Sequence, residues 1–267
     1  MAMPELPDVE NARRFTERAL KGRRIVRVAT VDDPIVYEGV TPRRFARILA
    51  GRRVLAVKRK GKHLWMVLDA PPFPLFHFGM TGSFELYRRA EERPRFWKVE
   101  LLMDNGTRLA MPDARRFGRI RLQEEPEADR PIRELGFDPL FGLPEVADLH
   151  LLLARRRAPI KAVLLDQSLF AGVGNWIADE VLYQAGLRPD RRANALRPAE
   201  TARLRARLLG IVRHAVAVHA DSDRFPKAWL FHRRWGKNAE ARTARGERIT
   251  HATIGGRTTA WVPSRQR

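Results

Sequence analysis

Two residues near the start of the chain could carry out covalent chemistry together. Pro4 is followed directly by Glu5 in the opening Met-Ala-Met-Pro-Glu-Leu-Pro-Asp-Val-Glu. A proline with a free terminal nitrogen is a secondary amine, and its attack on an aldehyde-level carbon gives a positively charged iminium. The iminium withdraws electrons from neighbouring bonds, so the pair is suited to breaking bonds in a sugar.

An ordinary structural role competes with this chemistry. Proline is common in the first turn of a helix, where its missing N–H costs nothing. Pro7 takes that role here, because an acidic first turn and an apolar stripe at helical spacing follow it. Pro4 is therefore left without a structural explanation.

The composition predicts a polyanionic partner. The 267 residues include 51 Lys and Arg against 31 Asp and Glu, a formal net charge of +20, which favours nucleic acid through phosphate neutralisation. Cysteine is absent, so disulfides, thiol nucleophiles and Cys-ligated zinc are excluded. No apolar run approaches the roughly 20 residues of a spanning helix. We expect a cytoplasmic monomer that binds no membrane and needs no metal or other cofactor.

The residues that could do chemistry must be positioned by a sheet-rich first half and a helical second half. Asp104-Asn105-Gly106 between two apolar runs is a strong hairpin signal. The predicted strands span residues 24–31, 53–58, 63–68, 84–87, 98–103 and 107–111. Apolar spacing of three and four residues predicts helices over 145–156, 161–169, 176–185 and 198–220.

An acidic, proline-rich stretch between the two halves indicates a boundary. We expect an N-terminal domain over residues 1–125, a linker over 126–143, a helical domain over 144–228 and a small basic hairpin over 229–267. Trp235, Ile249 and Trp261 are candidates for the packing that holds this hairpin.

Four later segments, in the same order as in one known family, accompany the Pro-Glu start. They are Arg59-Lys60-Gly61-Lys62-His63, Phe76 to Ser83, Asp113-Ala-Arg-Arg-Phe-Gly118, and Ile160-Lys161 through Gly172-Val-Gly174-Asn175. With them, nearly the whole chain resembles the formamidopyrimidine-DNA glycosylase and endonuclease VIII family, base-excision repair enzymes that flip a damaged nucleotide out of DNA.

The resemblance implies an α+β multidomain fold. It consists of an N-terminal antiparallel β-sandwich with flanking helices, a C-terminal helix-two-turn-helix domain and a β-hairpin finger. In the finger, the positions where relatives carry four zinc-binding cysteines hold Arg242, Arg245, Val262 and Arg265. This finger is therefore expected to be of the zincless type, with damaged double-stranded DNA held in a basic cleft between the domains.

The resemblance also implies the site residues. Pro4 is the nucleophile, Glu5 the acid that protonates the sugar oxygen, and Lys62 a catalytic-site lysine that binds phosphate near the scissile sugar. Extruding a nucleotide leaves a hole in the base stack, which proteins fill with apolar wedges and polar groups. The side chains implied to fill this hole, called the filling set below, are Met80, Arg115 and Phe117. Arg116 stands next to Arg115 and competes with it for this role. The implied phosphate contacts are His77, Lys161, Asn175 and Arg257.

The activity that follows is that of a bifunctional DNA glycosylase and abasic-site lyase, which removes oxidised or ring-opened bases and nicks the strand by β- or β,δ-elimination. Translation from Met1 and removal of that methionine would instead leave Ala2 at the terminus and the Pro4 nitrogen in an amide. The alternative is then a protein that binds damaged DNA without cutting it. A structural RNA-binding protein is the third hypothesis, but it leaves the segment Asp113 to Gly118 unexplained.

The sequence leaves the preferred lesion open. The opening segment Pro4 to Glu10 and the filling set are typical of the oxidised-purine branch of the family. The segment between Val218 and Trp229 is too short for the long capping loop of that branch. Relatives with zincless fingers often act on oxidised pyrimidines or ring-opened purines, so both substrate classes remain candidates.

Overall fold

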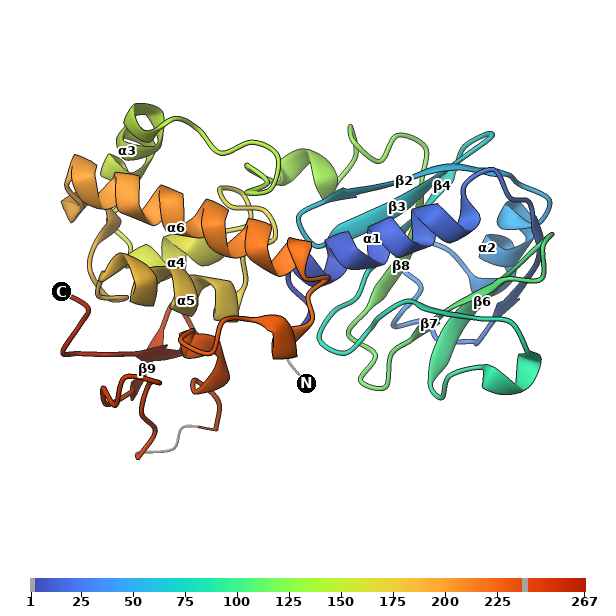
Figure 1. Cartoon of the computed structure of the whole chain (residues 1–267). Coiled ribbons are helices and arrows are strands. Elements are labelled where there is room, and N and C mark those ends of the chain that lie inside the picture. Colours follow the sequence, from blue (N-terminus) through green and yellow to red (C-terminus); the bar gives the residue numbers. More distant parts are fainter. Residues whose placement is uncertain (1–2, 237–239) are drawn as a thin grey trace. The chain divides into compact units, whose positions relative to one another are not determined.

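The chain folds into two compact units, residues 1–134 and 135–267 (Figure 1). The structure is a computed structural model that describes residues 3–236 and 240–267. Met1 and Ala2, on which the question of a free Pro4 nitrogen depends, lie outside the described residues. The division falls within the segment 126–143 expected to be the linker. The hairpin and the helices preceding it belong to one unit.

The first unit contains two four-stranded antiparallel sheets. One sheet has the order β1-β6-β7-β5, with strands Ile25–Thr30, Trp97–Met103, Arg108–Pro112 and Glu85–Tyr87. The predicted hairpin at Asp104 to Gly106 joins β6 to β7, and Gly106 supplies the left-handed residue of its turn with a φ of 80°.

The second sheet positions a lysine that the sequence singles out. Its order is β2-β3-β4-β8, with strands Val54–Lys60, His63–Leu68, Phe73–His77 and Arg119–Gln123. Lys60 pairs with His63, so only Gly61 and Lys62 lie in the connecting turn. Neither β4 nor β8 was predicted from the sequence.

The two sheets share one hydrophobic core. Buried residues from both sheets and from both helices of this unit belong to it, among them Phe45, Met66, Phe76, Leu101 and Ile120. Helix α1 (Leu6–Leu20) packs against β2, and α2 (Pro42–Leu49) packs against β1. Thr41 caps the unpredicted helix α2 by accepting the Arg44 N–H.

The second unit is helical. Its helices are α3 (Val146–Ala154), α4 (Ile160–Leu165), α5 (Asn175–Ala185) and α6 (Pro198–Ala217). The helix predicted to run to residue 169 ends at Leu165, because the next two side chains bind backbone groups of the turn. Asp166 accepts the Ser168 N–H, and the Gln167 amide donates to the carbonyls of Leu165 and Val173.

A two-stranded hairpin completes the second unit. Strands β9 (Thr250–Ile254) and β10 (Arg257–Trp261) are joined by Gly255 and Gly256, both with positive φ. Ile249 is buried at the base of the hairpin as expected, in a cluster with Tyr183, Leu230, Ala260 and Val262.

The two tryptophans contribute less to this packing than Ile249. Trp235 is 44% exposed, with its ring edge-on to that of Phe231, and Trp261 is partly buried beside the Arg188 guanidinium. Short 3-10 turns lie at Ala90–Glu92, Ile132–Glu134, Ala193–Ala195, Ser222–Arg224 and Leu230–His232. Among the described residues, no helix has the length and apolar character needed to cross a membrane.

Candidate active site and nucleic-acid interface

Helix α1 begins at Leu6, and Glu5 is its N-cap residue. The Asp8 carboxylate in the first turn accepts the Glu5 N–H at 2.9 Å, which holds the Glu5 backbone at the start of the helix. Glu5 is only 1% exposed, whereas Pro4 is partly exposed. A buried acid therefore stands next to an accessible proline.

The turn carrying Lys62 is anchored to the same helix. Arg59, at the end of β2, donates to the Glu10 carboxylate at 3.0 Å with both side chains fully buried, and also to the Gly61 carbonyl. Burial alone would raise the pKa of Glu10, but its bonds to Arg13 and the charge of Arg59 outweigh burial and hold the pKa at about 2. This ionised pair was not foreseen from the sequence.

The charge of Lys62 reaches both α1 and β4. Burial raises the pKa of Asp8 to about 6, and the nearby Lys62 ammonium partly opposes that rise. The same ammonium lowers the pKa of His77, after the larger effect of burial. Lys62 therefore lies close to the first turn of α1, which follows Glu5, and close to His77. The structure brings these predicted site residues into one neighbourhood.

His77 is neutral in this arrangement. Burial and the surrounding cations lower its pKa to about 4, and its ring lies 4.7 Å from that of His63. Its Nδ1 accepts the Gly79 N–H at 3.1 Å. Because a backbone N–H can only donate, the ring proton is assigned to Nε2. His77 can thus offer a phosphate oxygen one neutral N–H donor.

The loops that carry Met80 and Phe117 touch each other. Gly79 has a φ of 62°, and a Cβ there would lie 2.3 Å from the Phe117 carbonyl carbon, so only glycine fits. The fully buried Asp113 carboxylate accepts the Thr81 hydroxyl and the Gly118 N–H, both at 2.7 Å. Asp113 therefore joins the two loops and brings the predicted filling set together.

The structure separates the two neighbouring arginines. Arg116 has a φ of 59° and forms a forked pair with the buried Asp33 carboxylate. Arg115 instead lies exposed, with its guanidinium 5.0 Å from the ring centroid of Phe117, which is 46% exposed. Arg115 and Phe117 are therefore placed to meet a partner, whereas Arg116 holds the loop.

In the second unit, one buried carboxylate connects the helices to the hairpin. Asp179 on α5 lies 2.5 Å from the Lys161 ammonium and 2.6 Å from the Arg234 guanidinium. It also accepts the Ala260 N–H of β10 at 3.1 Å. The three side chains are almost completely buried. Asp179 was not singled out in the sequence.

Lys161 and Asn175 meet at the hairpin. Both donate to the Thr258 carbonyl, at 3.3 Å and 2.9 Å, and Gly255 at the hairpin tip packs against Ala162. The Lys161 side chain has 0% exposure, so its placement does not fit the expected direct phosphate contact and instead gives it a positioning role. Asn175 stands at the start of α5, and among the described residues its side-chain carbonyl oxygen finds no hydrogen-bond partner.

Arg257 follows the hairpin tip directly and is exposed. Its neighbour Thr258 is held by Lys161 and Asn175, so these three predicted residues are brought together. Gly172, by contrast, gives its backbone N–H to the Gln167 side chain. That N–H is therefore already satisfied within the turn.

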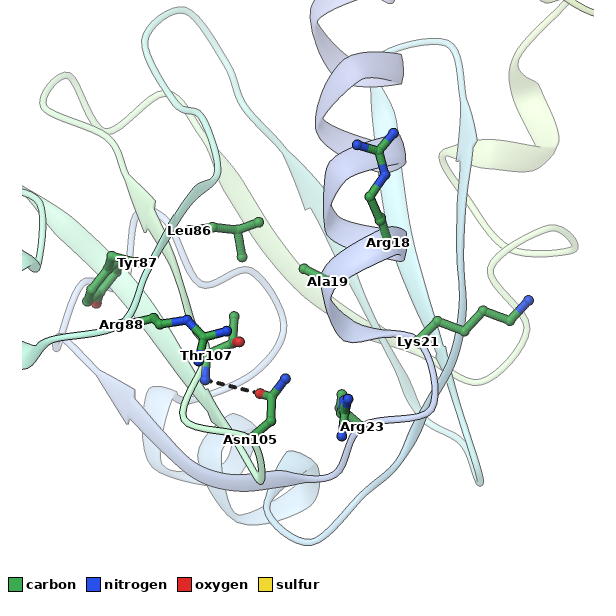
Figure 2. Close-up of a pocket in the computed structure, with 9 residues that line it drawn as sticks. All are labelled: Arg18, Ala19, Lys21, Arg23, Leu86, Tyr87, Arg88, Asn105 and Thr107. Atoms are coloured by element: carbon green, nitrogen blue, oxygen red, sulfur yellow. Dashed lines mark hydrogen bonds between the residues drawn. The ribbon is translucent and has the colours of Figure 1, made fainter.

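A basic pocket of about 480 Å³ lies elsewhere in the first unit, at the far end of α1 from Glu5. Its lining includes Arg18, Lys21, Arg23 and Arg88, together with Asn105 and Thr107. Figure 2 shows the Arg18 and Lys21 side chains extending away from Arg88 rather than converging with it. The pocket contains no predicted site residue and is not a candidate catalytic centre.

Comparison with known sequences decides the family. Residues 3–120 match the formamidopyrimidine-DNA glycosylase N-terminal domain, and residues 135–227 match the H2TH domain of the same glycosylase. The chain belongs to the formamidopyrimidine-DNA glycosylase family. It is accordingly a DNA glycosylase of base-excision repair.

Individual relatives cover the whole chain. A formamidopyrimidine-DNA glycosylase of Arabidopsis thaliana is 41% identical over 99% of this chain and 71% of its own length. One from Desulfitobacterium hafniense is 31% identical over 98% of each chain. A crystal structure of the Lactococcus lactis glycosylase, non-covalently bound to DNA containing an abasic site, aligns with a TM-score of 0.85 at 24% identity over 98% of this chain and 99% of that one.

Proposed function

We propose that the Pro4 nitrogen is the nucleophile of this glycosylase and Glu5 its acid. The observation that carries the proposal is the position of Glu5, which is buried at the N-cap of α1 directly beside the partly exposed Pro4. The Pro4 nitrogen attacks C1′ of the extruded nucleotide while Glu5 protonates the sugar ring oxygen. The bond from C1′ to the base breaks, the departing base takes up the proton that the Pro4 nitrogen loses, and an iminium joins the enzyme to the opened sugar.

The same iminium drives strand cleavage. As an electron sink it acidifies the C2′ proton, whose loss breaks the bond from C3′ to its phosphate oxygen in a β-elimination. A second, δ-elimination releases the sugar remnant. The positive charge of Lys62 near the start of α1 favours an unprotonated Pro4 amine at neutral pH, as attack requires.

DNA recognition in this proposal involves the remaining predicted site residues. In this proposal Lys62 and His77 bind the phosphates beside the reacting sugar, and Met80, Arg115 and Phe117 fill the space that the extruded nucleotide leaves. Asn175 and Arg257 bind backbone phosphates, and Lys161 supports them by holding Thr258.

The substrate range proposed here includes ring-opened purines and abasic sites. Relatives are named for formamidopyrimidine, and a crystal structure of the Lactococcus lactis glycosylase contains DNA with Fapy-dG. Oxidised pyrimidines remain the competing class because of the short segment before the finger. Since the substrate is chromosomal DNA, we place the enzyme at the nucleoid of a prokaryotic cytoplasm, acting as a monomer.

Borohydride trapping tests the covalent step. Protein with a mass-verified Pro4 terminus is incubated with duplexes carrying a ring-opened purine, an 8-oxopurine, an oxidised pyrimidine or an abasic site. We expect a reduced protein–DNA adduct, lost in Pro4→Gly and strongly diminished for base lesions in Glu5→Gln. Glu17→Gln, the same change on the same helix, is the matched control and should trap normally. Selective lesion binding without any adduct would favour a non-catalytic binder.

A further inference from the structure

Phe96 combines two unusual properties. Its ring is 55% exposed, and its backbone has a φ of 59°. A bulky residue in the left-handed region is a conformational outlier that costs free energy, and such outliers concentrate at functional sites. A large apolar side chain in water adds no burial energy to offset that cost. Neither property is explained by the fold alone.

The surrounding contacts hold the Phe96 backbone in this conformation. Its carbonyl accepts the N–H of Asp113 at 3.0 Å, and the next residue, Trp97, pairs with Pro112 at the start of β6. On the other side, the Arg93 guanidinium lies 4.5 Å from the Trp97 ring centroid and pairs with the buried Glu100. The loop is thus tied to Asp113, the residue that joins the two loops of the filling set.

An arginine accompanies each exposed phenylalanine in this region. The Arg95 guanidinium lies 5.2 Å from the Phe96 ring centroid, as Arg115 lies 5.0 Å from that of Phe117. A guanidinium on an aromatic ring presents a flat apolar face and a positive charge together, a combination suited to stacking on nucleobases beside phosphates. Asp113 links both pairs through its backbone N–H and its carboxylate.

We propose that Phe96 is a second DNA-contacting aromatic, whose ring stacks on a base exposed beside the gap that Phe117 fills. The inference rests on the proposed lesion binding. Bases in intact duplex are stacked on both faces, so the Phe96 ring gains a partner only where the stack is opened. Phe96 therefore adds affinity for lesion-containing DNA rather than for duplex in general.

The substitution Phe96→Gly separates this role from a structural one. Glycine relaxes the left-handed backbone, so the melting temperature should stay equal or rise. The dissociation constant for a duplex with a tetrahydrofuran abasic analogue should increase about tenfold, in the range that one lost base stack gives. Binding to the undamaged duplex should change less than twofold. Phe96→Tyr, which keeps the ring, should behave as wild type.

Leu55→Ala is the control for an exposed apolar side chain, since Leu55 is 44% exposed on β2. It should change neither the affinity for the abasic duplex nor that for the undamaged duplex. Unchanged abasic affinity in a stable Phe96→Gly variant would overturn the inference. So would a fall in melting temperature in both Phe96→Gly and Phe96→Asn, because asparagine also tolerates positive φ. Wild-type protein that fails to prefer the abasic duplex would instead refute the proposed lesion binding.

Discussion

At the scale of single residues, the structure separates side chains that face a partner from those that hold them. Arg115 and Phe117 are exposed, whereas Arg116 binds a buried carboxylate. Lys62 and His77 lie near Glu5, which is itself fixed by the helix cap. Adjacent residues of one chemical type can therefore have opposite roles, which only their partners reveal.

The paired arginines give the first prediction. Arg116→Ala removes the fork to Asp33, whose other cation is Lys98, and should lower stability, because the buried Asp33 carboxylate keeps only one cation. Arg115→Ala should leave stability within about 0.5 kcal/mol but weaken discrimination between bases opposite the lesion. Thermal unfolding measures the difference in stability. Excision from four duplexes, each with a different base opposite the lesion, measures the discrimination. Equal behaviour of the two variants would contradict the assignment.

Asp8 gives a pH-dependent prediction. Its pKa is about 6 in the folded protein, chiefly because of burial, against an ordinary value of 3.8 for an aspartate carboxyl. The folded state therefore binds the proton more tightly, so the contribution of Asp8 to stability is full below pH 4 and is lost as the pH rises through 6.

Asp8→Asn keeps an acceptor for the Glu5 N–H without this titration. We expect the stability of Asp8→Asn relative to wild type to increase between pH 4 and 7, by about 2 kcal/mol or less. Urea unfolding at several pH values checks this. A stability difference that stays constant with pH would show that Asp8 does not titrate in this range.

At the scale of elements, short side chains and glycines set where helices, strands and turns meet. Gly79 allows two loops to touch, and Gly255 allows the hairpin tip to reach α4. The Asp179 carboxylate binds Lys161 of α4, the Ala260 N–H of β10 and the Arg234 guanidinium, so it fixes the hairpin relative to the helices. The position of Arg257 depends on this network.

Asp179→Asn tests the network. The substitution leaves the buried Lys161 and Arg234 without a matching negative charge, which should cost about 3 kcal/mol of stability. Affinity for abasic duplex should also fall, because the strand that carries Arg257 loses its anchor. Asp190→Asn removes an exposed pair with Arg188 and should cost less than about 0.5 kcal/mol. Calorimetry of both variants distinguishes a buried network from a surface pair.

At the scale of the whole molecule, the net charge of +20 governs association with DNA. Phosphate neutralisation makes binding weaken steeply with salt, and each contacting cation adds to the slope. Arg257→Ala should weaken binding to every duplex and reduce the slope of log K against log salt by about one. Arg197→Ala, which removes an exposed arginine already paired with Glu200, should leave the slope unchanged. Titrations at several salt concentrations provide the measurement.

The sheet-rich first half, the helical second half and the site residues that lie together in each unit could be predicted from the sequence. Hydrophobic periodicity, the Asn-Gly turn and the motif spacing are local signals. Which charged residues are buried could not be predicted in this way. Lysine is usually a surface residue, yet Lys161 is buried and pairs with Asp179, eighteen positions away along the chain. Asp113 and Phe96 were likewise missed, since their importance comes from long-range contacts rather than from a pattern.

The Asp179 network has a chemical consequence for the tail of the molecule. Where thiolates grip a metal, peroxide or an alkylating reagent can dismantle the fold by modifying sulfur. Carboxylate, guanidinium and ammonium groups do not react in that way, and the chain contains no cysteine. The hairpin that carries Arg257 is therefore held by groups that such reagents leave intact.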